Sequence, residues 1–120
     1  MSRGGSLHAL PVLAVAGAMA CAAASPRRVS APAPADPNEL YFCVVAQVNA
    51  LGYRVRRYDR ESQFIQAVSL RPQGRDANLD PLYNEVTVTV SHDTSGDTMH
   101  VTASDRRHGE AILKRCAAKR

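Results

Sequence analysis

A run of arginines between residues 54 and 60 is the only local concentration of charge in the chain. Strand-like alternation places Arg54 and Arg56 on one face together with Tyr58. Guanidinium groups form paired hydrogen bonds with carboxylate and phosphate oxygens, so this face suits a phosphate, carboxylate or sugar-acid ligand. The same alternation is also compatible with a solvated strand face that binds nothing.

The histidines are the side chains whose type best suits proton transfer or metal binding. His92 and His100 fall on opposite faces of one expected strand pair, which disfavours a metal site shared between them. His100 faces Thr89 across that pair, and His108 follows Asp105 near the start of an expected helix. A small hydrolase or metal-dependent enzyme, with His100 or His108 as the base, is the alternative hypothesis. It requires a pocket in which that histidine reaches a serine, threonine or carboxylate.

The sequence contains no motif for an activated nucleophile, a zinc protease site, a phosphate-binding loop or a calcium-binding loop. We therefore predict no catalytic residue, no metal and no cofactor.

Two hairpins are expected to position these side chains. The first joins 53–58 to 64–70, and Phe64, Val68 and Leu70 share one face of its second strand. The second joins 86–91 to 98–103, where valines alternate with threonines and Gly96 supplies the positive φ of the turn. One-sided alternation pairs Val90 with Met99, Val88 with Val101, and Val86 with Ala103. The outward face, with loop 72–82 at its rim, is the candidate ligand surface: Arg54, Arg56, Tyr58, Thr87, Thr89, His100 and Thr102.

One helix is expected on either side of the strands in sequence. Apolar residues at helical spacing predict a helix that starts near Asn38 and ends at Gly52, with Cys43 on its core face. A last helix follows a cap at Ser104 or Asp105 and carries positive charge at its carboxyl end. The predicted fold is a single α+β domain over 38–120, in the order helix, four-stranded antiparallel sheet of two hairpins, helix. Both helices are expected on one sheet face.

The first 20 residues are typical of a secretory signal peptide. Arg3 precedes an uncharged stretch that is too short for a transmembrane helix and ends in small residues. Ala18-Met19-Ala20-Cys21 resembles the lipobox of bacterial lipoproteins, with Ala18 where those proteins usually have leucine. The resemblance implies that Cys21 is lipidated and anchors the protein to a membrane facing the periplasm or the cell exterior. The same alanines also suit an ordinary signal peptidase, which leaves secretion without lipid as an alternative.

Residues 21–37 are predicted to be the anchor cysteine and an Ala/Pro-rich linker, since 22–37 contain four prolines and six alanines. Such a spacer extends by about 3.1 Å per residue, which gives a reach of at most roughly 50 Å.

Export leaves Cys43 and Cys116 as an even pair in an oxidising compartment, so we predict a disulfide between the two helices. Residues 36–120 carry 12 basic and 11 acidic side chains, and this near balance argues against nucleic acid as a partner. We expect a noncatalytic cell-envelope domain that binds a protein, glycan or anionic ligand. A purely structural envelope lipoprotein is a further alternative, and the sequence sets no oligomeric state.

Overall fold

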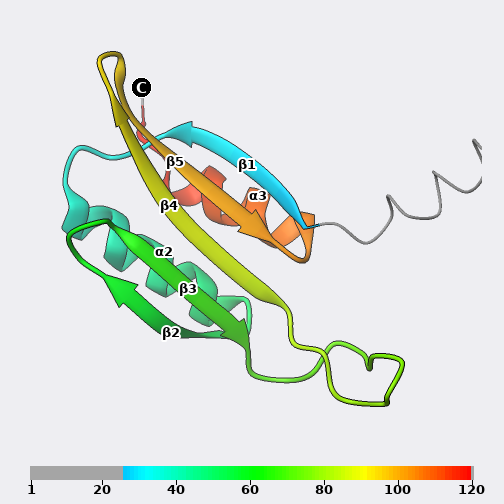
Figure 1. Ribbon diagram of the computed structural model, residues 1–120. Helices are drawn as coiled ribbons and strands as arrows, with labels where there is room; N and C mark the ends of the chain where they lie inside the picture. The colour runs from blue at the N-terminus through cyan, green and yellow to red at the C-terminus, as the bar shows by residue number, and fades with distance from the viewer. Residues whose placement is uncertain (1–25, 120) are drawn as a thin grey trace, which may run out of the picture.

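The computed structural model describes residues 26–119, which form an α+β fold with one antiparallel sheet and two helices (Figure 1). The sheet has five strands in the order β1-β5-β4-β3-β2. The elements in chain order are β1 (Arg27–Pro32), α2 (Pro37–Ala50), β2 (Tyr53–Asp59), β3 (Phe64–Ser69), β4 (Glu85–Asp93), β5 (Gly96–Ala103) and α3 (Arg106–Cys116). The predicted signal segment 1–20 and Cys21 lie outside the described residues.

The two helices begin at aspartate caps. The Asp36 side chain accepts a hydrogen bond from the Asn38 backbone N–H at 2.9 Å, and Pro37 occupies the first turn, where its missing N–H costs nothing. Asp105 caps α3 in the same way through the Arg107 backbone N–H at 3.0 Å. Gly52, with a φ of 90°, follows α2 and turns the chain into β2.

The central hairpin of β4 and β5 has the predicted register. Val90 pairs with Met99, Val88 with Val101 and Val86 with Ala103. Val88, Met99 and Val101 are completely buried, while the threonines between them face away from the helices. A slip by one residue would expose this whole set, so the one-sided pattern fixes the register.

The predicted count of four strands is wrong, because β1 forms a fifth strand within the segment that we expected to be a linker. Arg27–Pro32 pairs with β5 along its length, and Val29 lies opposite Val101. A Cβ placed on Gly109 would lie 3.6 Å from Val29, so this valine packs under α3. Proline is tolerated on an edge strand, where one row of backbone groups faces solvent. The element order is therefore strand, helix, four strands, helix.

A β-bulge in β2 corrects the predicted position of Tyr58. Val55 pairs with Ala67 and Arg57 with Gln66, so Arg56 is an extra residue that has no opposite partner. The extra residue reverses the alternation beyond it. Tyr58 consequently lies opposite the buried Ile65, on the helix side, instead of sharing the outward face with the arginines.

The core lies between the sheet and the two helices, which cover the same face (Figure 1). Leu40, Val44 and Val48 line the inner side of α2, and Ile112 lines that of α3. In β3 the core residues are Ile65 and Ala67, so Phe64 and Val68 share the opposite, open face of the sheet. The predicted disulfide between Cys43 and Cys116 is confirmed and joins α2 to α3, with the Cα atoms 5.6 Å apart.

Candidate functional site

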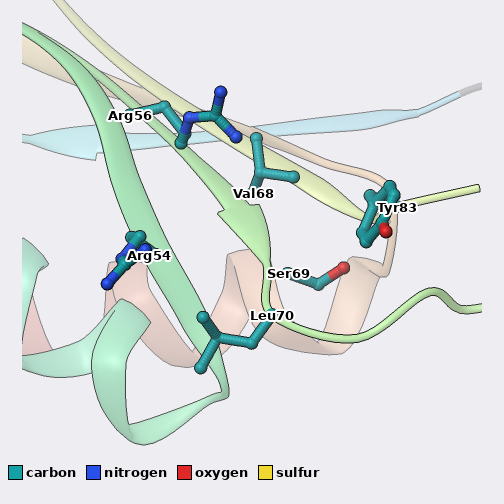
Figure 2. Close-up of a pocket in the computed structure, with 6 residues that line it drawn as sticks. All are labelled: Arg54, Arg56, Val68, Ser69, Leu70 and Tyr83. Carbon is teal, nitrogen blue, oxygen red and sulfur yellow. The ribbon is translucent and has the colours of Figure 1, made fainter.

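The arginine cleft is a hollow of about 230 Å³ on the open face of the sheet, where β2 and β3 meet the chain that leads into β4. Figure 2 shows Arg54 and Arg56 along β2 and Tyr83 across the cleft, with Val68 between them. Six residues line it: Arg54, Arg56, Val68, Ser69, Leu70 and Tyr83. The cleft therefore combines two cations with an apolar floor and an aromatic ring.

The β-bulge gathers these charges on one face. Arg54 lies opposite Val68 and Arg57 lies opposite Gln66, both on the open face. Arg56, the extra residue between them, lines the same cleft as Arg54. A regular strand would alternate faces, whereas a bulge places two successive side chains against one partner residue.

These guanidinium groups have no carboxylate partner within the described part of the chain. Ion pairs there involve Arg106 and Arg107 but not Arg54, Arg56 or Arg57. Two unneutralised guanidinium groups beside an apolar floor can bind a phosphate or carboxylate in the fork-like geometry that arginine favours. The adjacent Val68 and Tyr83 can cover an apolar or ring-shaped part of the same ligand.

The other predicted ligand residues form a separate group on the central strands. Thr89 lies opposite His100, as expected from the register. The His100 ring lies between two serine hydroxyls, at 2.6 Å from Ser30 and 2.9 Å from Ser91. Two strands, β3 and β4, separate His100 on β5 from the arginines on β2, which at about 4.8 Å per strand is roughly 14 Å. The structure thus brings together Arg54 with Arg56, and Thr89 with His100, but not the four as one site.

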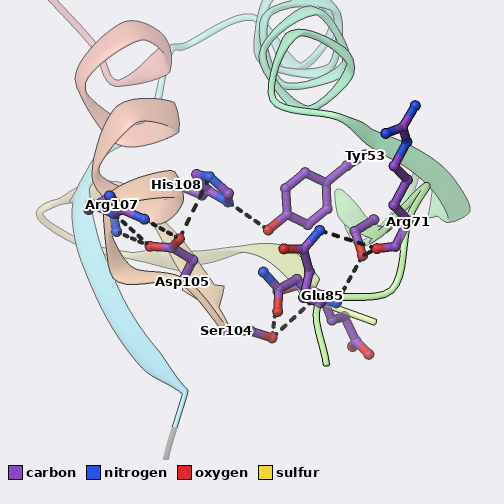
Figure 3. Close-up of polar contacts among 10 residues, drawn as sticks. Tyr53, Arg71, Glu85, Ser104, Asp105, Arg107 and His108 are labelled. Carbon is purple, nitrogen blue, oxygen red and sulfur yellow. Dashed lines mark hydrogen bonds and ion pairs between the residues drawn. The ribbon is translucent and has the colours of Figure 1, made fainter. Parts of the chain in front are cut away.

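A second polar cluster, which the sequence pattern did not reveal, connects the start of β2 with the start of α3 (Figure 3). The hydroxyl of Tyr53 lies 2.7 Å from Nδ1 of His108, and Nε2 of His108 lies 3.8 Å from the Asp105 carboxylate. Tyr53 and His108 also line a pocket of about 180 Å³. The only sequence signal was the short spacing between Asp105 and His108, because Tyr53 is distant in the chain.

Burial sets the electrostatics of this cluster. The pKa of Tyr53 is raised, mainly because burial disfavours the phenolate, and the negative charge of Asp105 adds to the effect. A hydrogen bond with Asn84 opposes it. The pKa of Asp105 is lowered, chiefly by its side-chain hydrogen bond with Arg107. Tyr53 is therefore a neutral phenol, and Asp105 a carboxylate, at neutral pH.

The cluster lacks an available nucleophile. Ser69 lines the same pocket, but its hydroxyl donates to the Arg71 carbonyl at 2.9 Å and accepts from the Asn84 backbone N–H at 3.0 Å. Both sides of the His108 ring face polar groups of the protein itself, Tyr53 and Asp105. This arrangement is typical of a satisfied structural network that fastens α3 to the sheet.

The third histidine of the described region, His92, lies at the exposed end of β4 and contacts the Asp97 carboxylate at 2.7 Å. Within residues 26–119, no group of three or more histidine, cysteine, aspartate or glutamate side chains is arranged to hold a metal ion.

Comparison of the chain with protein-family models gives no match, and no curated protein is similar to it in sequence. Neither helix of the described region is both long and apolar enough to cross a membrane.

Proposed function

We propose that this protein is an exported, lipid-anchored and noncatalytic cell-envelope domain that binds an anionic ligand in the arginine cleft. The unpaired guanidinium groups of Arg54 and Arg56, which the bulge presents beside Val68 and Tyr83, carry the proposal. Because the strand is rigid, the two guanidinium groups need little rearrangement to bind a ligand. Their unpaired positive charge favours a ligand that carries a negative charge. The lipobox-like segment ending at Cys21 supports the anchoring part.

Of the partner classes expected from the sequence, the cleft favours an anionic ligand that also has an apolar or ring-shaped part. A ligand of this kind fits the floor and the aromatic wall as well as the two cations. The enzyme hypothesis has less support, because His108 is held by Tyr53 and the nearby Ser69 hydroxyl is held by backbone groups.

Phenyl phosphate is a suitable probe, because it combines a phosphate with one ring, and phenol serves as its neutral counterpart. We expect phenyl phosphate, but not phenol, to perturb the backbone amide resonances of residues 54–57 and 68–70 in a titration. The Arg54→Ala/Arg56→Ala variant should bind at least tenfold more weakly, since each charge-assisted hydrogen bond contributes about 1.5–3 kcal/mol.

The matched control is Arg60→Ala/Arg115→Ala, which removes the same charge from exposed positions outside the cleft. It should bind phenyl phosphate as the unchanged protein does. Equal weakening in both double variants would show that only net charge matters, and a failure of the unchanged protein to bind would refute the proposed ligand class.

A further inference from the structure

Residues 70–84 form a protrusion beyond the ends of β3 and β4 (Figure 1). Backbone hydrogen bonds join its two sides, from Gln73 N–H to the Leu82 carbonyl and from Leu82 N–H to the Gly74 carbonyl. At the tip, the Asp76 carboxylate accepts from the backbone N–H groups of Asn78 and Asp80. The protrusion is therefore a hydrogen-bonded structure that holds its side chains in fixed positions.

The protrusion exposes large apolar side chains that the core does not use. Leu79 at the tip is 72% exposed and has a φ of 66°, a conformation unfavourable for leucine. Leu70 is 61% exposed, and Leu82 and Tyr83 are each about half exposed. An exposed apolar group of this kind marks an interaction surface. The backbone of Leu79 is held in this conformation by hydrogen bonds from its N–H to the Asp76 carbonyl and from the Arg75 side chain to its own carbonyl.

This protrusion lies at the end of the sheet where the amino-terminal segment enters. Pro26, just before β1, lines a hollow together with Tyr83 and Glu85. Because β1 begins at Arg27, only six residue steps separate Cys21 from the sheet, and they span at most about 22 Å. A lipid on Cys21 would thus hold this end of the domain close to the bilayer.

The charges at this end suit anionic headgroups. Arg27, Arg71 and Arg75 are exposed here, and Arg54 lines the arginine cleft together with Leu70. Two neighbouring carboxylates are engaged within the fold, Asp76 by backbone groups and Glu85 by the Gln66 side chain at 2.8 Å, whereas the Asp80 carboxylate beside Leu79 is exposed. In the described part of the chain Arg27, Arg54 and Arg71 form no ion pair, so they are available to phosphates at the membrane surface, while Arg75 donates to the Leu79 carbonyl at 2.8 Å.

We infer that the protrusion and the arginine cleft form one membrane-contact surface, in which Leu79 and Leu82 enter the headgroup region and the cleft binds a lipid phosphate. The inference rests on the proposed function, since it identifies the anionic ligand of the cleft as a phospholipid headgroup. It also gives the exposed apolar side chains and the amino-terminal anchor a common orientation.

A single tryptophan reports contact with lipid, because the chain contains none. The full chain carrying Leu82→Trp is placed on phosphatidylglycerol vesicles, with Phe42→Trp as the control. Phe42 is 68% exposed on α2, eight residues before the end of the helix. That end of α2 leads into β2 at the same end of the sheet as the protrusion, so Phe42 lies away from the protrusion. We expect emission from position 82 to shift to shorter wavelength and to be quenched by brominated acyl chains, and emission from position 42 to do neither.

Leu79→Asn tests the apolar contact without disturbing the fold, because asparagine tolerates a positive φ better than leucine does. In a Cys21→Ser background, which lacks the lipid, it should lower partitioning onto phosphatidylglycerol vesicles by about tenfold, the loss expected for one buried leucine side chain. Phe42→Asn should leave partitioning unchanged, and pure phosphatidylcholine vesicles should bind the unmodified domain more weakly.

The outcomes separate this inference from the proposed function. If phenyl phosphate binds the cleft but the tryptophan of the Leu82→Trp variant stays in water on vesicles, the anionic-ligand proposal stands and the membrane inference is overturned. If that tryptophan reaches lipid only in the lipidated chain and Leu79→Asn changes nothing, the anchor alone holds the protein and the inference is again wrong. Absence of lipid on Cys21, read from the mass of the mature amino terminus, would refute the anchoring proposal, while the Cys21→Ser vesicle measurement still decides the inference.

Discussion

Tyr53 is a titratable side chain that lies deep in the described part of the fold. It is only 2% exposed, and its hydroxyl lies 2.7 Å from His108 on a helix that begins 53 residues later. One phenol thus links the first strand of the outer hairpin to the last helix. Its hydrogen bond satisfies a buried polar group and fixes where α3 begins on the sheet.

The raised pKa of Tyr53 gives the protein an alkaline limit of stability. Folding favours the neutral phenol, so this contribution is complete below the ordinary tyrosine pKa of about 10 and is lost as pH rises above it. The phenolate absorbance of Tyr53, taken as the difference between the unchanged protein and Tyr53→Phe, should develop above the ordinary tyrosine pKa of about 10. In Tyr53→Phe the free energy of unfolding should be lower at neutral pH and less dependent on pH above about 10. A Tyr83→Phe control, which changes an exposed ring, should retain the alkaline loss.

Asp105 gives a corresponding limit in acid. Its lowered pKa means that folding favours the carboxylate, so the stabilisation is present above the ordinary aspartate pKa of about 3.9 and is lost as pH falls through the lower folded value. Asp105→Asn keeps a capping oxygen but removes the charge that faces Arg107 and His108. We expect a loss of up to about 1 kcal/mol at neutral pH, from the charge that interacts with the helix dipole and Arg107, and this loss should disappear in strong acid. A difference that stays constant with pH would contradict this account.

Among the elements, α3 packs against the sheet through Gly109. A Cβ at this position would lie 3.4 Å from the Ala103 Cβ and 3.7 Å from a Val101 methyl group, which is ordinary contact. The space between α3 and the sheet can therefore hold a Cβ at position 109, so the packing does not require glycine there. Glycine within a helix costs roughly 0.5–1 kcal/mol relative to alanine.

Gly109→Ala should consequently stabilise the protein by about 0.5–1 kcal/mol, measured as a higher midpoint of denaturant unfolding with an unchanged slope. Gly109→Leu should destabilise it, because the larger side chain would push α3 away from β5 and β1. Destabilisation by alanine as well would show that the contact with Ala103 cannot relax.

The elements also differ in how far sequence alone determines them. The β4–β5 hairpin was predictable to the residue, because burial of one face permits a single register for Val88 and Val101. Strand β1 was not, since its prolines and alanines offer little to bury and its pairing partner lies about 70 residues away. The bulge at Arg56 could not be predicted either, because it depends on the partner strand. The predicted position of Tyr58 was wrong because the prediction assumed a regular strand.

The candidate site shows the same division. Alternation correctly placed Arg54 on the open face and Thr89 opposite His100. The cleft itself needs Tyr83, which comes from the chain between β3 and β4 and has no periodicity to reveal it. The contact between Tyr53 and His108 likewise arises only when the last helix docks on the sheet.

For the molecule as a whole, the disulfide joins two halves of one helical layer. α2 packs on β2, whereas α3 packs on β1 and β5, so the helices cover different parts of the sheet. Cys43 and Cys116 lie 73 residues apart in sequence and connect these parts directly. A bridge that closes a loop of this length restricts the unfolded chain strongly, by roughly 4 kcal/mol in the chain-entropy model.

A domain of this size has a total stability of only about 5–15 kcal/mol, so loss of the bridge removes a large share of it. We expect Cys43→Ala/Cys116→Ala to lower the free energy of unfolding by about 3–4 kcal/mol, measured by denaturant titration, and to unfold at a clearly lower temperature. A reductant should lower the stability of the unchanged protein to a similar extent and leave the double variant unaffected. Alkylation of both thiols in the mature protein before any reduction would show that the bridge does not form. The expectation that the domain resides in an oxidising compartment would then lose the support of this cysteine pair.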